Sequence, residues 1–399
     1  IWTRLRLGVA RAWQAANDRS YFYAGPTRSA DKAAWKQAAL AETARSASAA
    51  YGVGLFDLQK AFERVPWDIL ATAARETGYD LRLLRLSIAA YSLDKAVTVG
   101  GACSRMVRAK RGITAGSAFA TIELRLLLIR ALDAVARVSR TTTLTVYVDD
   151  VAIEAVGTVS LLTVHWFSAM RALVTQSEAL RLEFSDTKNV VVASPPALAH
   201  AAVAAIPQIS LSARLTARSL GAGLGAGARR CAHVARGRIG AFAARRARFR
   251  MLARAGVSTA QLLRTGGIAA MTFGTAVMGV STSALRAQRR AAASALASSV
   301  AGADLDLSLL VADGIRGHAA DPAFAAHAEP LAAWAVAVWE RWLPRSAFSR
   351  IIARAIRRIT TAKRPWAVVQ GPAAAVVATA LRIGWRFADA FNVVTDLDE

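Results

Sequence analysis

The chain has 399 residues, of which 54% are hydrophobic, and its 51 Lys and Arg residues against 27 Asp and Glu residues give a formal net charge of +24. This length can bury a sizeable core and form two or three domains. The charge predicts an anionic partner, nucleic acid first, although a GC-rich genome can supply part of the arginine excess. Because only Cys103 and Cys231 are present, the composition excludes a disulfide framework and indicates a reducing compartment.

The chain opens with Ile1-Trp2-Thr3-Arg4, which includes neither an initiator Met nor a signal-peptide pattern. We therefore expect a fragment or a conceptual translation that begins inside a longer protein. The residues up to about 50 are Ala-rich and mostly helical in pattern. Gly25-Pro26 marks a loop within them, and Ser29 can serve as the N-cap of a helix over residues 30–50.

A short apolar run over residues 51–58 predicts a strand that ends on Asp57, followed by a turn into a helix. Two helices are predicted between residues 67 and 91, with Gly78-Tyr79-Asp80 between them. The alternating residues 95–107 contain Gly100-Gly101 and predict a hairpin.

Residues 111–117 form a predicted loop that leads into a long apolar helix ending at about Leu132. Gly112 and Gly116 let the backbone of this loop approach a ligand closely, next to the N-terminus of the helix.

Residues 144–153 hold the adjacent carboxylates of Asp149 and Asp150 between two β-branched half-strands. This pattern predicts a β-hairpin with both carboxylates at its tip. Two like charges side by side repel each other unless cations neutralise them, and oxygen ligands suit Mg²⁺ or Mn²⁺. For an isolated Asp-Asp pair, a solvated turn is the alternative interpretation.

After the hairpin, residues 159–182 have helical periodicity, and Lys188 lies in a loop before a β-branched strand. From Thr187 through Ala303 the sequence has no Asp or Glu but fifteen arginines, nine of them between Arg229 and Arg254. A solvated face laced with salt bridges would carry both signs of charge. This segment therefore predicts contacts with phosphates.

Three features complete the C-terminal half. Residues 221–227 are Gly-rich and predict a hinge. The uncharged run 265–285 favours a buried helix pair over a membrane-spanning helix, because it contains several Gly, Ser and Thr residues. Residues 304–399 read as helices with five tryptophans, which we expect to pack against helices rather than to stack on bases.

Three aspartates at strand ends can hold two metal ions, which clamp the attacking and leaving oxygens of a phosphoryl transfer. In this respect the sequence resembles the reverse transcriptases of non-LTR (LINE-type) retrotransposons over about residues 20–300. The segment Phe56-Asp57-Leu58-Gln59-Lys60-Ala61-Phe62 looks like their first carboxylate motif, and Tyr147-Val148-Asp149-Asp150 looks like their Tyr-x-Asp-Asp motif. The loop 111–117 is similar to their Gly-x-x-Gln-Gly-Ser motif, except that Ala115 replaces Gln and cannot make its side-chain hydrogen bond.

The resemblance implies an α+β fold of the right-hand polymerase type, in which fingers and a palm with an antiparallel sheet precede a helical thumb and a C-terminal helical segment. The implied domains are partial fingers (1–50), a catalytic fingers and palm domain (51–220), a basic helical thumb (221–303) and a helical C-terminal domain (304–399).

The resemblance also implies the site residues. The catalytic carboxylates would be Asp57, Asp149 and Asp150, which together with Leu58 form the expected site for two Mg²⁺ ions, or Mn²⁺. Lys188 would protonate or neutralise the pyrophosphate leaving group. The expected substrate-binding residues are Phe62 under the nucleotide sugar, Tyr147, Gly112, Gly116, Ser117, Arg28 and Lys32. The expected nucleic-acid contacts are Arg229, Arg230, Arg236, Arg238, Arg245, Arg246, Arg248 and Arg250.

The activity implied by this resemblance is RNA-directed DNA synthesis, the two-metal addition of deoxynucleotides to a primer 3′-hydroxyl during retrotransposition. The implied partners are an RNA template, a DNA primer and deoxynucleoside triphosphates, with no membrane, and the implied location is the nucleus. Two alternatives stay open. One is a polymerase-derived protein that binds nucleic acid without catalysis, and the other is an intron maturase, which shares the palm.

Overall fold

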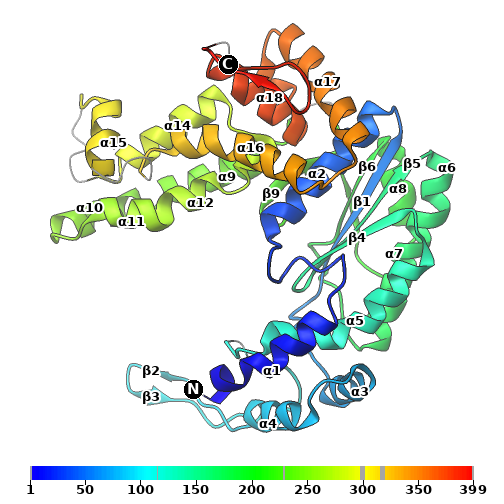
Figure 1. The fold of residues 1–399 in the computed structure, drawn as a ribbon. Coiled ribbons are helices and arrows are strands. Elements are labelled where there is room, and N and C mark those ends of the chain that lie inside the picture. The colour runs from blue at the N-terminus through cyan, green and yellow to red at the C-terminus, as the bar shows by residue number, and fades with distance from the viewer. Residues whose placement is uncertain (1, 115, 228–229, 297–301, 315–319, 398–399) are drawn as a thin grey trace. The chain divides into compact units, whose positions relative to one another are not determined.

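The computed structural model describes residues 2–114, 116–227, 230–296, 302–314 and 320–397 (Figure 1). The chain is a mixed α+β protein that divides into two compact units. Unit one comprises residues 1–29 and 52–214, and unit two comprises residues 30–51 and 215–399. The predicted segment 1–50 is thus divided between the two units after Ser29.

Unit one is built on a five-stranded mixed sheet with the strand order β4-β5-β1-β6-β7. The strands are β1 (Ala50–Asp57), β4 (Thr142–Tyr147), β5 (Asp150–Gly157), β6 (Val190–Ser194) and β7 (Ser212–Arg214). β4 and β5 pair antiparallel, whereas β6 and β7 pair parallel. The first carboxylate strand β1 therefore lies inside the sheet, with the predicted hairpin β4–β5 on one side and β6 on the other.

Helices pack against this sheet, and glycines in β1 make room for two of them. The helices of unit one are α1 (Trp2–Ala16), α3 (Trp67–Thr77), α4 (Leu81–Tyr91), α5 (Ala120–Val138), α6 (Val159–Leu161), the π-helical η1 (Leu162–Trp166), α7 (Phe167–Ala179) and α8 (Pro196–Ala204). The buried Trp166 ring lies so close to Gly52 that a Cβ there would come within 2.5 Å of it. A Cβ at Gly54 would come within 2.8 Å of the Met170 sulfur. The two glycines therefore let η1 and α7 pack directly on the backbone of β1.

The two helices predicted between residues 67 and 91 are confirmed as α3 and α4, and their ends have local causes. Gly78 closes α3 with a left-handed backbone (φ +70°), which glycine adopts without steric cost. Asp80 then caps α4, because its carboxylate accepts hydrogen bonds from the N–H groups of Arg82 and Leu83. The predicted hairpin is also present, as β2 (Thr98–Val99) and β3 (Ala102–Cys103).

Unit two is mainly helical. Its elements are α2 (Ala30–Ser46), β8 (Thr216–Ser219), β9 (Ala222–Gly225), α9 (His233–Ala243), α10 (Arg246–Arg254), α11 (Thr259–Leu262), η2 (Leu263–Gly267), α12 (Ile268–Thr272), α13 (Thr275–Met278), α14 (Thr282–Ala293), α15 (Leu305–Asp313), α16 (Pro322–Trp339), α17 (Arg345–Thr361), the 3₁₀ turn η4 (Pro365–Ala367), α18 (Pro372–Arg382), β10 (Arg386–Phe387) and β11 (Val393–Val394). Aromatic residues from three of its helices form part of its core. Trp334 packs 6.1 Å from Trp35 and 5.3 Å from Phe348, measured between ring centroids.

Unit two differs from the sequence-based expectations at three places. The helix predicted over residues 30–50 ends at Ser46, and Ala50 already begins β1. The Gly-rich segment predicted as a hinge instead contains β9, paired with β8 around a turn in which Leu220 and Gly221 both have positive φ. Trp339 was expected to pack but is 87% exposed.

The uncharged run 265–285 forms short helices rather than one long one. Gly274 and Gly279, both with positive φ, interrupt it on either side of α13. Met271 and Val277 within it are each 1% exposed, as expected for a buried helix pair. Across the described part of the chain, no helix is both long enough and apolar enough to span a bilayer.

Candidate functional site

The predicted hairpin forms, with its tip shifted by one residue. Tyr147 pairs with Asp150 at the end of the β4–β5 ladder, so the turn consists of Val148 and Asp149, and Asp150 is the first residue of β5. Val148 has a left-handed backbone with φ +62°. This turn position usually carries glycine, and a β-branched side chain there stores about 1–2 kcal/mol of strain. Asp149 is thereby half-buried, whereas Asp150 is exposed.

Asp57 ends β1 and is fixed by hydrogen bonds on both sides of its Cα. Its N–H donates to Oδ1 of Asn189 at 2.9 Å, and its carbonyl oxygen accepts from the N–H of Ser185 at 2.8 Å. The Nζ of Lys188 lies 3.1 Å and 3.2 Å from the two carboxylate oxygens. The loop 183–189 thus holds both the backbone and the charge of the first predicted carboxylate.

The electrostatics place Asp57, Asp149 and Lys188 in one neighbourhood. Burial raises the pKa of Asp149, and the negative charges of Asp57 and Glu63 raise it further, while the charge of Lys188 opposes them. In the sheet, β5 is the hydrogen-bonded neighbour of β1. The structure therefore pairs the strand that ends at Asp57 with the strand that begins at Asp150, although the two are distant in the sequence.

The carboxylate oxygens of Asp57 and Asp149 are hard ligands and suit a hard divalent cation. A cation between these two carboxylates would also reduce the repulsion of their like charges. The Leu58 side chain is apolar and 4% exposed, so this residue could contribute only its backbone carbonyl. Within the described residues, no three carboxylate, imidazole or thiol side chains are grouped closely enough to hold a metal ion. The Lys188 ammonium, at salt-bridge distance, is the group that neutralises Asp57 in this arrangement.

Phe62 and Gly112 lie on two segments that contact each other directly. The N–H of Ile113 donates to the carbonyl of Phe62 at 2.7 Å, and that of Gly112 donates to the carbonyl of Val65 at 2.8 Å. A Cβ at Gly112 would lie 2.6 Å from the carbonyl oxygen of Glu63. Gly112 is therefore needed for close packing against the turn after Asp57, and this packing fixes the turn that carries the half-buried Phe62.

The remainder of the glycine loop joins the start of α5. The Tyr91 hydroxyl donates to Glu123 at 2.6 Å, and its oxygen lies 2.9 Å from the Ser117 hydroxyl oxygen, which can donate to it. Gly116 has φ +84° with no atom within 4 Å of a built Cβ, so its backbone conformation, rather than a neighbour, requires glycine. Ala115, the expected departure from the motif, lies outside the described residues.

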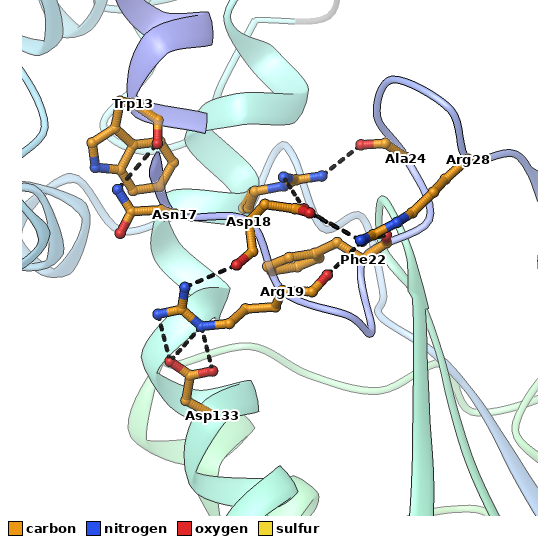
Figure 2. Close-up of polar contacts among 9 residues, drawn as sticks. Trp13, Asn17, Asp18, Arg19, Phe22, Ala24, Arg28 and Asp133 are labelled. Carbon is orange, nitrogen blue, oxygen red and sulfur yellow. Dashed lines mark hydrogen bonds and ion pairs between the residues drawn. The ribbon is translucent and has the colours of Figure 1, made fainter. Parts of the chain in front are cut away.

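Arg28 is engaged inside unit one rather than free at its surface (Figure 2). Its guanidinium donates to the carbonyls of Arg19 and Phe22 at 2.5 Å and 2.7 Å and pairs with Asp18 at 3.0 Å. Figure 2 also shows Arg19 bonded to Asp133 of α5. Through these contacts Arg28 stabilises the loop that carries it. The contacts are all with the protein itself, so they account for the position of Arg28 without a bound substrate.

Lys32 belongs to unit two, on the first turn of α2. Its Nζ lies 2.6 Å from Glu340 and 4.7 Å from the centroid of the Trp342 ring. These contacts explain its position at the junction of α2 with the segment after α16.

The predicted nucleic-acid-binding arginines separate into two groups. Arg230 and Arg238 are structural: both donate to backbone carbonyls, and their guanidinium groups lie over the rings of Trp366 and Phe273. The solvent-exposed members are Arg236, Arg245, Arg246, Arg248 and Arg250. Arg229 lies outside the described residues. The exposed arginines are concentrated on α10 and the turn before it, where they are available to phosphates.

Sequence reasoning missed Asn189, which the structure places at the centre of the site. It is 1% exposed, and its Nδ2 donates to the carbonyls of Ser185 and Ser210 while its Oδ1 accepts from Asp57. The adjacent Lys188 was singled out for its charge, but no local pattern marks an Asn as a buried connector. No known protein-family model matches this chain, and no curated protein is significantly similar to it.

Proposed function

We propose that this chain is an RNA-directed DNA polymerase of the right-hand type, acting in retrotransposition. The observation that carries the proposal is the contact of the Lys188 ammonium with the Asp57 carboxylate at the end of β1, together with the position of the Asp149–Asp150 hairpin strand β5 as the neighbour of β1 in the sheet. Carboxylates on neighbouring strands, with a lysine ammonium beside them, support nucleotidyl transfer, because two metal ions held by carboxylates can activate the nucleophile and a cation can stabilise the leaving pyrophosphate.

Each residue has a separate part in this proposal. Asp57, Asp149 and Asp150 would hold two Mg²⁺ ions, with Mn²⁺ as a substitute, and the bound ions would supply the charge that activates the primer 3′-hydroxyl and steadies the triphosphate. Lys188 would exchange its contact with Asp57 for one with the departing pyrophosphate. Phe62, beside the strand end, would exclude a ribose 2′-hydroxyl and so select deoxynucleotides.

The partners follow from the same proposal. The exposed arginines of unit two would hold the RNA template paired with the DNA primer by contacts with phosphates, independently of base sequence. Tyr147, Gly112, Gly116 and Ser117 would shape the binding site for the incoming deoxynucleoside triphosphate. Retrotransposition would place this activity in the nucleus.

Primer extension on poly(rA)/oligo(dT) with Mg²⁺ tests the proposal. The wild type should incorporate dTTP, and Asp149→Asn and Asp150→Asn should each lower the rate by at least about 10²-fold, since each removes a charged ligand at the reacting centre. Glu178→Gln is the matched control, because Glu178 is an exposed carboxylate on α7, outside the site, and the substitution removes the same charge. Its rate should stay within about twofold of the wild type. Equal incorporation by the wild type and both site variants would contradict the assignment.

One observation favours a second function, the binding of nucleic acid without catalysis. Lys188 already neutralises Asp57 through a two-oxygen contact, so the carboxylate does not need a metal ion for charge balance. A protein of this kind would bind an RNA–DNA duplex with strong salt dependence, but no Mg²⁺ concentration would yield extended primer. The same extension assay on the wild type therefore distinguishes the two functions: extended primer supports the polymerase, and duplex binding without extension supports the non-catalytic protein.

A further inference from the structure

A buried carboxyl group near the start of α5 has no part in the proposed chemistry. Glu123 lies in the first turn of this helix and is 0% exposed. Its Oε2 accepts a hydrogen bond from the Tyr91 hydroxyl, at the end of α4, at 2.6 Å. Burial raises the pKa of the carboxyl group, and the hydrogen bond from Tyr91 opposes this shift. Because a buried carboxyl group is costly unless it is hydrogen-bonded, this contact holds the two side chains together.

The Tyr91 hydroxyl links this carboxyl group to the end of the glycine loop. Its oxygen lies 2.9 Å from Oγ of Ser117, which can donate to it. The same Oγ accepts a hydrogen bond from the N–H of Phe119 at 3.3 Å. A hydroxyl that donates and accepts at the same time has a fixed orientation. Ser117 is therefore held between a side chain of α4 and the backbone that leads into α5.

A second contact joins the same two segments. Lys95 follows α4, and its Nζ donates to the carbonyl of Tyr91 at 3.1 Å and to Oγ1 of Thr114 at 3.0 Å. The N–H of Ser117 in turn donates to the carbonyl of Thr114 at 3.1 Å. The two contacts reach the loop at positions three residues apart, so they fix its C-terminal part to the end of α4.

The other end of the loop is attached to the turn that follows β1. The indole N–H of Trp67 donates to the carbonyl of Gly112 at 2.8 Å, and the N–H of Gly112 donates to the carbonyl of Val65 at 2.8 Å. The loop is thus held at both ends, at Gly112 by this turn and at Ser117 by Tyr91. A shift at either end would move backbone that the proposed function assigns to the incoming triphosphate.

We propose that Tyr91 and Glu123 are positioning residues, which act through the Ser117 hydroxyl to hold the glycine loop in the conformation that binds the incoming deoxynucleoside triphosphate. The inference rests on the proposed function and adds two residues to it that no sequence motif marks. A binding loop that is already ordered does not have to be ordered by its ligand, and this strengthens binding. The proposed reacting groups lie elsewhere, on β1 and the β4–β5 hairpin. Loss of the contact should therefore weaken nucleotide binding and leave the chemical step almost unchanged.

Steady-state primer extension by the full chain on poly(rA)/oligo(dT) tests the proposal, with KM and kcat measured for dTTP. Tyr91→Phe keeps the ring and removes the hydroxyl, so KM should rise by about threefold to tenfold, as expected for one hydrogen bond, with kcat within about twofold. A variant that is merely misfolded in part would lower kcat and leave KM unchanged. Glu123→Gln keeps an acceptor oxygen for Tyr91 and should keep KM within about twofold of the wild type.

A double-mutant comparison shows whether Tyr91 acts through Ser117. Ser117→Ala alone should raise KM as Tyr91→Phe does, which keeps the test available if Tyr91→Phe does not fold. In the Ser117→Ala background, Tyr91→Phe should change KM by less than about twofold, because the contact is already lost. A full additional rise of KM in that background would overturn the proposal.

Tyr79→Phe is the matched control, because Tyr79 is 3% exposed, close to the 4% of Tyr91. Its hydroxyl is also buried, but it has no hydrogen-bond partner among the described residues. The substitution should leave both KM and kcat within about twofold of the wild type. An equal rise of KM in the two phenylalanine variants would overturn the proposal, and so would a Tyr91→Phe variant with the KM of the wild type.

Equilibrium binding of dTTP in the presence of a dideoxy-terminated primer separates this inference from the proposed function, because no chemistry can follow. Primer extension by the wild type with equal dTTP affinity in Tyr91→Phe would overturn the positioning role alone. Tighter dTTP binding by the wild type than by Tyr91→Phe, without extension by either, would support the positioning role and overturn the polymerase. A wild type that is folded by circular dichroism and neither binds dTTP nor extends the primer would overturn both.

Discussion

Among single residues, Asn189 does most to hold the candidate site together. Its amide joins the backbone of Asp57 in β1 to the carbonyls of Ser185 and Ser210, and its side chain is shielded from water. The Asp57 carboxylate can be oriented only as well as its backbone is held. The position of the first predicted catalytic group therefore depends on an uncharged neighbour.

Asn189→Ala should lower the free energy of unfolding by about 2–3 kcal/mol, because it leaves one buried N–H and two carbonyls without their partner. Urea denaturation followed by circular dichroism would measure this loss. Asn17→Ala is the comparison: Asn17 is half-buried and makes one hydrogen bond to Trp13, so we expect a loss below about 1 kcal/mol. Similar losses in the two variants would argue against a special role for Asn189.

Glu329 shows how a single buried carboxyl group couples stability to pH. Burial raises its pKa to about 7, and the charge of Asp31 adds to the effect. The folded state therefore holds this proton more tightly than the unfolded state. As pH rises from about 4.3 through 7, the wild type should lose stability from this group.

Glu329→Gln removes the titration, so the variant should match the wild type near pH 4 and be more stable above pH 7. The full shift corresponds to about 3 kcal/mol, and because the group is only partly buried we expect about 1–2 kcal/mol. Thermal unfolding across this pH range would give the difference directly. A gain that is constant with pH would mean that ionisation is not its cause.

The residues of the site were predictable from sequence to different degrees. Asp57, Asp149 and Asp150 follow short apolar runs, and this local pattern is sufficient to place them at or next to strand ends. The backbone of Val148 was not predictable, because valine rarely adopts positive φ and only the pairing of β4 with β5 imposes it. Asn189 was missed for a related reason, since its partners lie in three separate segments.

At the scale of elements, close packing of a helix on a strand determines the sequence of β1. Gly52 lies beneath Trp166, whose indole N–H donates to the carbonyl of Ile153 in β5 at 2.9 Å. The ring is therefore held in place and cannot move away from an added methyl group. A strand that ends in the predicted first carboxylate is thus made partly of glycine, which has a low intrinsic preference for strands.

Gly52→Ala should destabilise the protein by about 1–3 kcal/mol through overpacking. Gly8→Ala supplies a control of opposite sign, because Gly8 lies in the middle of α1 with no atom within 4 Å of a built Cβ. That substitution should raise stability by about 0.5–1 kcal/mol, as alanine does in an open helical position. Chemical denaturation of both variants would show the contrast, and a neutral Gly52→Ala would contradict the packing seen at Trp166.

Helix ends and hairpins were predictable wherever one residue determines them, as Gly78 and Asp80 do between α3 and α4. The Gly-rich segment 221–227 was interpreted wrongly as a hinge, because glycine permits both a flexible link and a tight strand. Gly223 in β9 lies against Cys231, whose sulfur would be 2.9 Å from a built Cβ. Gly221 and Gly223 are therefore needed for close contact, whereas no atom lies within 4 Å of a Cβ at Gly227. Composition alone does not distinguish these roles.

At the scale of the whole molecule, the arginines that contribute to the net charge of +24 have different surroundings. Arg230 and Arg238 bind backbone carbonyls and aromatic rings within unit two. By contrast, Arg246, Arg248 and Arg250 of α10 are exposed to solvent. α10 is attached through Phe249, whose ring packs 5.4 Å from that of Phe242. The division into two units was not predictable from composition, because residues 30–51 join unit two across a long sequence separation.

Binding of an RNA–DNA duplex should weaken steeply with salt, and α10 should account for part of the slope. The double variant Arg248→Gln/Arg250→Gln should reduce the slope of log K against log salt by about 1–2, at about 0.9 for each lost phosphate contact. Arg171→Gln, an exposed arginine on α7, is the control and should leave the slope unchanged. Fluorescence anisotropy over a salt series would measure it, and parallel slopes for all the proteins would exclude α10 as a contact surface.

The left-handed backbone of Val148 has a consequence for how sequences at the hairpin tip can vary. Glycine or asparagine would relax the turn, so a library randomised at this position and selected only for heat resistance would be enriched in those two. Under the proposed polymerase activity, the tip must keep Asp149 in one orientation, and the stiffness of a branched side chain at position 148 would then be favoured. Selection for heat resistance and selection for the proposed activity would thus favour different residues at this position.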